Sequence, residues 1–405
     1  MSSNTSQDET PAHQPLDMDQ NLDRSQLEPQ PPYTSAELEE QLERFQNLVQ
    51  QLSSDERVAL DYEWAWRFKG GESGLHLGAS VMIHGNEVGP LVGLLDIMES
   101  LASGRLSFPG TFTCFIGNPE AARLQRRFVD IDLNRVFEVS SLEEGEVIPH
   151  EVRRAQKLIK LLNSFDLYID FHQTILDSAQ PFYISPWSEE AWRWMRLMGG
   201  AKVWVTRDPS RGGGGLKCAD EYVRRRGQPS VALELGALGF SAQARSGVWR
   251  SLSRALNAIN ELSQGTSDLM SLAESQPELT FYETRTRYPF DDAALTLKPG
   301  WVNFSPVRRG ALLTEDSSGP DIAVEVPSEH AADHETHADE ASPLARYASE
   351  SGALLFPKYP PRDDQGRALD PRPAELCRIV TPLKGHPLDL WSRTPVEDHQ
   401  AEESP

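Results

Sequence analysis

Apolar residues along the chain follow two spacings, one typical of buried strands and one typical of helices. Six short apolar runs predict strands, at residues 79–83, 111–116, 167–171, 181–184, 202–205 and 231–235. Helical spacing predicts helices at residues 88–103, 150–165, 189–198 and 248–262. Several of the strands are apolar on both faces, as in a sheet that helices cover on each side. The pattern therefore predicts an α/β fold, with a mixed central sheet and helices on both faces.

A further helix is predicted to begin near residue 35, ahead of the first strand. Thr34 and Glu37 have the spacing of a capping box, and Tyr33 and Leu38 have the spacing of a hydrophobic staple. Apolar residues then recur at helical spacing as far as Leu52. We expect this helix to pack on the outside of the α/β domain.

Three segments lack the apolar residues that a folded core requires. Residues 1–32 and 393–405 are polar, acidic and rich in proline, and residues 315–350 hold ten acidic residues against one arginine. Such segments bury too little apolar surface to offset the loss of chain entropy on folding. We therefore expect a disordered arm at 1–32, a disordered acidic insertion at 315–350 and a disordered tail at 393–405.

Two folded units are predicted between these segments. Residues 33–275 carry the alternating strands and helices of the α/β domain. From 276 to 392 the pattern changes to short strand-like pieces that proline and glycine interrupt, at 279–288, 300–307 and 374–381. These pieces predict a small C-terminal all-β domain, which the acidic insertion would divide.

Charge and cysteine content narrow the choice of partners and compartment. The 405 residues include 61 acidic and 39 basic ones, and the resulting net charge of −22 disfavours nucleic acids and anionic membranes as partners. The three cysteines are scattered, which suits a reducing compartment. The first residues lack the apolar core of a signal peptide, and no apolar run is long enough to span a bilayer. We expect a cytoplasmic protein; its oligomeric state is not indicated.

The first candidate for chemistry lies in residues 81–90, where an apolar run ends at His84 and Glu87 follows. Zinc binds imidazole nitrogen and carboxylate oxygen, and a catalytic zinc uses three protein ligands and a water. His172, at the end of another predicted strand, is a candidate third ligand, and Asp170 on the same strand face would orient it. The alternatives are a solvated or helix-capping pair at 84–87 and an ordinary hydrogen-bonded histidine at 172.

Two further groups have the chemistry of a hydrolytic site. Glu234 lies in an otherwise apolar strand, where burial would raise its pKa toward the value that a general base needs. An ion pair with one of the arginines at 224–226 is the alternative. The segment 126–137 includes Arg127 and Arg135, whose guanidinium groups suit the binding of a carboxylate or the polarisation of a carbonyl oxygen. Ordinary surface ion pairs are the alternative for this segment.

In their order along the chain, five motifs resemble the succinylglutamate desuccinylase/aspartoacylase family, a branch of the zinc carboxypeptidase-like fold. The motifs are His84-Gly-Asn-Glu87, Gly117-Asn118-Pro119, Arg127 through Asp132-Leu-Asn134-Arg135-x-Phe137, Asp170-x-His172-x-Thr174, and Glu234-x-Gly236. The likeness covers most of residues 77–262. Residues 299–310 and 355–357 resemble the small β domain of that family more loosely.

The resemblance implies a zinc-dependent amidohydrolase that cleaves the amide bond of a small anionic N-acyl amino acid. Its first expected substrate is of the N-succinylglutamate type, and the second is of the N-acetylaspartate type. His84, Glu87 and His172 would bind one Zn²⁺ per chain. Glu234 would be the general base that acts on a zinc-activated water, and Arg127 would polarise the amide carbonyl and stabilise the oxyanion.

The resemblance also implies a substrate clamp. Asn134 and Arg135 would bind the α-carboxylate of the substrate, and Asp132 would orient His84. Two other functions remain open from the sequence: a metallocarboxypeptidase that acts on a short peptide, and a non-catalytic family member with a binding role. Neither the acyl group nor the residues that the C-terminal region adds to the pocket can be assigned from the sequence.

Overall fold

A computed structural model gives the fold and describes residues 32–71, 74–138, 148–209, 217–315, 344–365, 367–368 and 373–391. The strands are β1 (Ala65–Lys69), β2 (His76–Val81), β3 (Thr111–Ile116), β4 (Leu167–Thr174), β5 (Phe182–Pro186), β6 (Val203–Arg207), β7 (Ser230–Ala237), β8 (Thr280–Pro289), β9 (Ser305–Val307), β10 (Gly352–Leu355) and β11 (Glu375–Pro382). The α-helices are α1 (Ser35–Gln50), α2 (Ser54–Leu60), α3 (Pro90–Ala102), α4 (Pro119–Arg123), α5 (His150–Leu162), α6 (Glu189–Met198), α7 (Ala219–Arg225), α8 (Ala242–Ser263), α9 (Leu269–Glu274) and α10 (Pro387–Trp391).

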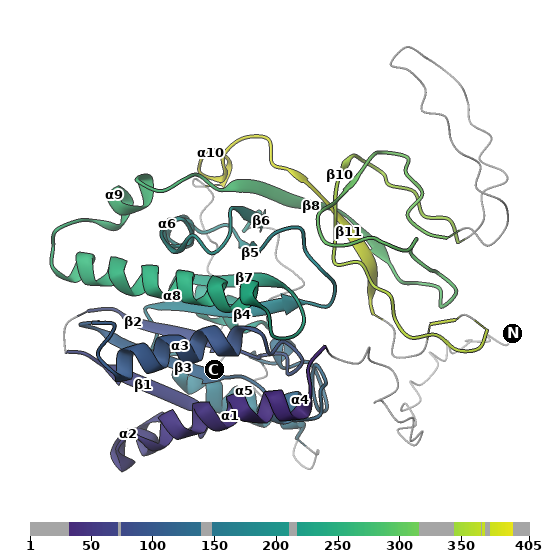
Figure 1. The fold of residues 1–405 in the computed structure, drawn as a ribbon. Coiled ribbons are helices and arrows are strands. Elements are labelled where there is room, and N and C mark those ends of the chain that lie inside the picture. Colours follow the sequence, from purple (N-terminus) through teal and green to yellow (C-terminus); the bar gives the residue numbers. More distant parts are fainter. Residues whose placement is uncertain are drawn as a thin grey trace, which may run out of the picture.

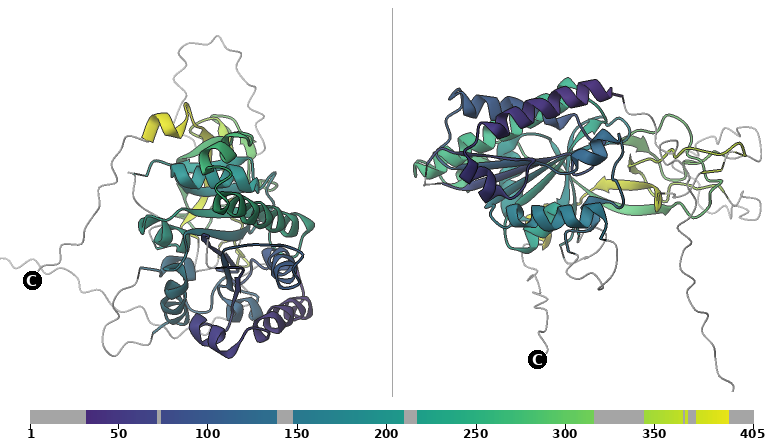
Figure 2. Two further views of the ribbon diagram at one scale, coloured as in Figure 1. Left: turned by 90° about the vertical axis from the view of Figure 1, so that its left-hand side faces the viewer. Right: turned by 90° about the horizontal axis from the view of Figure 1, so that it is seen from below.

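Within the described residues, the strands form one mixed sheet in the order β1-β3-β2-β4-β7-β5-β6-β8-β11-β10-β9. Helices α3 and α8 pack against each other, and Figures 1 and 2 show helices on both faces of the sheet. The predicted mixed α/β fold is therefore confirmed. No helix in the described ranges has the length and apolar content needed to cross a membrane.

Helix α1 begins as predicted. The Thr34 hydroxyl accepts a hydrogen bond from the Glu37 N–H (3.2 Å), and the Glu37 carboxylate accepts one from the Thr34 N–H (2.7 Å). This reciprocal pair satisfies two backbone donors that the helix itself cannot satisfy. The apolar face of α1, which includes the fully buried Phe45, packs over α3 and α4 on the outside of the domain.

The order of the central strands brings three carboxyl ends to one edge of the sheet. Strand β2 pairs in parallel with β4, and β4 pairs in parallel with β7. His172 at the end of β4 is in register with Glu234 on β7, so their side chains lie on the same face. A register shift follows directly after His172. Functional residues of α/β sheets commonly gather at this edge.

The C-terminal strands extend the central sheet, and a separate all-β domain is not confirmed. The first part of β8 pairs in parallel with β6, and the length of β8 pairs with β11, which leads on to β10 and β9. One strand thus belongs to both regions. A second apolar core, around Leu295, Leu313 and Leu376, lies in the C-terminal part, which Figure 1 shows beside the main body of the protein.

Most of the segments expected to be disordered lie outside the described residues: 1–31 of the arm, 316–343 of the insertion, and the whole of 393–405. The end of the insertion differs from the expectation. Ala348 and Arg346 bond through their backbones to Ala311 and Leu313, which places residues 344–350 on the C-terminal core. Backbone pairing therefore overrides the polar composition there.

We expect Phe45→Ala to lower the free energy of unfolding by about 3–5 kcal/mol, because it removes a fully buried aromatic ring between α1 and the domain. Chemical denaturation followed by circular dichroism measures the change. Val58→Ala, at a side chain that is 78% exposed on α2, is the control and should stay within about 0.5 kcal/mol of the wild type. An equal loss in both variants would contradict the packing role of α1.

Candidate active site

The loop between β2 and α3 carries His84 and Glu87 away from the end of the strand. Met82 takes a left-handed backbone conformation (φ 56°) that turns the chain after β2. A Cβ atom at Gly85 would lie 2.4 Å from the Ala122 nitrogen, so only glycine fits there. The Gly85 N–H donates to the Arg127 carbonyl (2.9 Å), which ties this loop to the arginine-rich segment.

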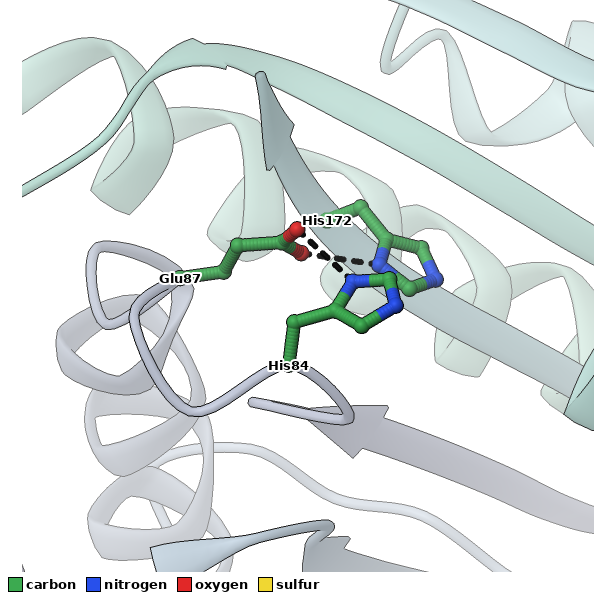
Figure 3. Close-up of side chains that lie close together, drawn as sticks. All are labelled: His84, Glu87 and His172. Carbon is green, nitrogen blue, oxygen red and sulfur yellow. Dashed lines mark hydrogen bonds and ion pairs between the residues drawn. The ribbon is translucent and has the colours of Figure 1, made fainter. Parts of the chain in front are cut away.

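The structure brings His84, Glu87 and His172 together, and all three are buried. Glu87 Oε1 lies 2.7 Å from His84 Nδ1, and Glu87 Oε2 lies 2.8 Å from His172 Nδ1 (Figure 3). One ligand atom from each residue lies within 4.8 Å of the others. Two imidazole nitrogens and a carboxylate are a donor set that suits Zn²⁺. The three residues could therefore hold a metal ion.

Each imidazole is also held from its other side. His172 Nε2 lies 2.9 Å from Asp170 Oδ2, and His84 Nε2 lies 3.3 Å from Asp132 Oδ1. The Ser80 hydroxyl donates to the second oxygen of Asp170 (2.6 Å). Both Nε2 atoms thus face a carboxylate while both Nδ1 atoms face Glu87, an arrangement that orients metal-binding histidines in proteins.

Opposite charges offset the burial of the ionised groups. Burial acts to raise the pKa of Glu87, but the two imidazoles outweigh it and hold that pKa below its usual value. Burial acts to lower the pKa of His172, whereas Asp170 and Glu87 raise it well above the usual value. For Asp132, Arg127 and His84 overcome burial and depress the pKa. Charged carboxylates are therefore favoured at this site.

Glu234 lies beside this group without a partner. Its Oε2 atom is buried and makes no hydrogen bond within the described part of the chain. Burial raises its pKa to about 7, an effect that His172 reduces and Glu87 reinforces.

The alternative for Glu234, an ion pair with one of the arginines at 224–226, is not found in the structure. Arg224 pairs with Glu221 (2.8 Å), and Arg225 pairs with Glu138. Arg226 lies over the ring of Tyr222 (5.9 Å to its centroid). The carboxylate of Glu234 is thus left for a proton or a ligand.

Arg127 reaches the metal-binding group, and Asn134 and Arg135 lie farther out. The Arg127 guanidinium donates to Asp132 (3.1 Å) and lies 2.6 Å from His84 Nε2 and 3.4 Å from Glu87 Oε1. Asn134 Oδ1 accepts the N–H of the first residue of α7 (2.8 Å). Arg135 is exposed and donates to the Asn134 carbonyl (2.7 Å). Among the described residues, neither Asn134 nor Arg135 makes a hydrogen bond to the histidines.

Comparison with known proteins assigns the chain to a family. Residues 79–259 match the model of the succinylglutamate desuccinylase/aspartoacylase catalytic domain. The succinylglutamate desuccinylase of Pseudomonas fluorescens is 30% identical over 259 residues, which cover 60% of this chain and 74% of that protein. The chain belongs to the succinylglutamate desuccinylase/aspartoacylase family. It is therefore a member of a family of hydrolases that remove acyl groups.

Two further comparisons agree with this assignment at different levels. The succinylglutamate desuccinylase of Pseudomonas paraeruginosa is 36% identical over 126 residues, but the match covers only 29% of this chain and 37% of that protein. The crystal structure of the succinylglutamate desuccinylase of Vibrio parahaemolyticus superposes with a TM-score of 0.53 and 17% identity, covering 80% of this chain and 87% of that one. At that identity the likeness establishes the fold.

The C-terminal region of this family member adds two cations that the sequence did not indicate. Lys358 lies close enough to Arg127 and Glu234 for both to influence its ionisation, and burial together with Arg127 lowers its pKa to about 8. Arg378 lies over one ring, that of Phe356, which Lys358 also contacts (5.0 and 5.6 Å to the centroid). The sequence around an isolated basic residue in a β-rich region does not indicate that its side chain will lie near the active site.

Asn303 explains how these cations reach the site. Its buried side chain donates to the Leu176 and Asp177 carbonyls after β4 and accepts the Phe356 N–H (2.7 Å). The segment that carries Lys358 is thereby fixed to the loop that follows His172. The C-terminal region is therefore part of the wall of the candidate site.

We expect Asp170→Asn to weaken Zn²⁺ binding by roughly 10- to 100-fold, because His172 would lose the carboxylate that orients its ring. Competition with a chromogenic zinc chelator measures the affinity, and circular dichroism checks that the fold is kept. Asp177→Asn, which removes the same charge at an exposed position after the strand, should leave affinity unchanged. An unaltered affinity in Asp170→Asn would contradict the orienting role.

Proposed function

We propose that the protein is a zinc-dependent amidohydrolase of N-acyl acidic amino acids. N-succinylglutamate is the first candidate substrate, and N-acetylaspartate-type compounds are the second. The observation that carries the proposal is Glu234, whose buried Oε2 has no hydrogen-bond partner among the described residues, beside the buried group of His84, Glu87 and His172. A base with a pKa near neutrality, next to three side chains that could bind a metal, provides the groups that metal-assisted hydrolysis requires.

His84, Glu87 and His172 would hold the metal, and their donor atoms fit zinc. When bound, Zn²⁺ supplies Lewis acidity and lowers the pKa of water. Glu234 would take a proton from the attacking water and deliver it to the leaving nitrogen. Its buried, unpartnered oxygen has no competing hydrogen bond within the described residues.

Arg127 would stabilise the negative charge that develops on the carbonyl oxygen. Its guanidinium is fixed by Asp132 and lies within 3.4 Å of Glu87, so its position needs little reorganisation during the reaction. Burial tends to lower its pKa, but Asp132 and Glu87 raise it, which keeps the group charged.

The surrounding cations support an acidic substrate. Asn134 has its oxygen engaged by α7, which leaves its amide nitrogen as a donor to a carboxylate. Arg135, Lys358 and Arg378 add positive charge around the same region, since burial and, more weakly, the nearby Arg135 lower the pKa of Arg378. Guanidinium and ammonium groups are suited to the carboxylates of both the acyl group and the amino acid.

A panel of N-acyl amino acids tests the proposal. We expect release of an acyl acid from N-succinylglutamate or N-acetylaspartate, activity that a chelator abolishes and Zn²⁺ restores, and no release of C-terminal residues from short peptides. Chromatography of the free amine and the free acid distinguishes these reactions. Activity on peptides alone would favour a metallocarboxypeptidase, and no turnover would favour a binding role.

Variants tested in the same assay determine whether Glu234 is the general base. Glu234→Gln should lower kcat by ~10²- to 10⁴-fold while the protein keeps its zinc, because the general base is lost. Glu274→Gln, at the exposed last residue of α9, removes the same charge and should retain full activity. An active Glu234→Gln enzyme would exclude Glu234 as the base.

The pKa of Lys358 gives a separate prediction. Since this pKa lies at about 8, the ammonium loses its charge as the pH rises through that value, and KM for acidic substrates should rise above it. Below pH 8, Lys358→Met should raise KM about tenfold, with a smaller change in kcat. In this variant KM should no longer increase as the pH rises above 8. Lys69→Met, at an exposed lysine, is the control. A pH-dependent KM in Lys358→Met would assign the titration to another group.

A further inference from the structure

A second basic cavity lies where β6 ends and β8 continues. The ladder between these strands ends at the pair Thr206–Glu283, whereas β8 runs on to Pro289. The step borders an open cavity of about 240 Å³, whose lining includes Arg207, Arg285, Arg287 and Arg378. Four arginines around a small cavity are unusual in a chain with a net charge of −22.

Three carboxylates stand against these four arginines: Asp208 and Glu283 line the cavity, and Glu375 lies beside Arg287 and Arg378. Part of the positive charge is therefore unmatched. Arg285 pairs with Glu283, while Arg378 and Arg287 share the single carboxylate of Glu375 (2.7 and 3.9 Å). The side chain of Arg207 has no ion-pair or hydrogen-bond partner among the described residues.

We propose that this cavity, which adjoins the candidate active site at Arg378, is an anion-binding site for a small dianion. Guanidinium forks bind phosphate, and the same forks bind the two ends of a short dicarboxylate. The volume is below that of ordinary small-molecule pockets, which favours a compact ligand. The cavity borders the substrate region at Arg378. Arg378 and Lys358 both lie over the ring of Phe356.

Calorimetric titration of the full chain tests the site, with inorganic phosphate and with succinate in separate experiments at constant ionic strength. We expect at least one of them to bind with 1:1 stoichiometry, and the comparison identifies which anion the site prefers. Arg207→Gln and Arg287→Gln should each weaken binding about tenfold or more, because each removes one positive charge from the lining. Arg57→Gln, an exposed arginine on α2, is the matched control and should bind as the wild type does.

The binding readout is independent of turnover, so its failure differs from a failure of the proposed hydrolase activity. The proposal is overturned if neither anion binds. It is also overturned if Arg135→Gln abolishes binding while Arg207→Gln and Arg287→Gln do not, because the anion would then occupy the candidate active site. Circular dichroism of both cavity variants confirms that the fold is intact before titration.

Discussion

The carboxylate of Glu87 is the contact on which the candidate site depends. Its two oxygens meet imidazoles from two separate elements, and it also accepts the N–H of Gln173 on β4 (3.1 Å). Removing such a charge from water is costly unless opposite charges and hydrogen bonds surround it. Here Arg127 and the histidines provide them, and in return the carboxylate fixes the β2–α3 loop against the central strand.

The backbone around this contact is shaped to hold it. Met82, Phe304 and Phe356 all have positive φ (56°, 67° and 52°), a conformation that is uncommon for residues with side chains. The first begins the loop that carries His84, and the other two flank Asn303 and Lys358 in the C-terminal wall. Strained residues persist where surrounding packing over-determines them, and they gather at functional sites.

The sequence was sufficient for the parts that local pattern determines. Capping residues located α1, apolar runs located the central strands, and ordered motifs led to His84, Glu87, His172 and Glu234. It was insufficient where distant pairing decides. Strand β1 alternates apolar and basic residues at the sheet edge, β10 is only four residues long, and Lys358 resembles any surface lysine until Asn303 and β11 place it. The sequence likewise did not indicate that β8 pairs with both β6 and β11 and so makes the sheet continuous.

Local charge explains how a chain with a net charge of −22 could attract the anionic substrate proposed for it. At physiological salt, the field of exposed carboxylates fades within about 8 Å, whereas buried pairs are screened much less. Arg127, Lys358 and Arg378 lie inside the walls of the site, where burial strengthens their attraction. Since two of these three come from the C-terminal region, substrate choice within this family should vary with that region while the metal-binding edge of the central sheet stays the same.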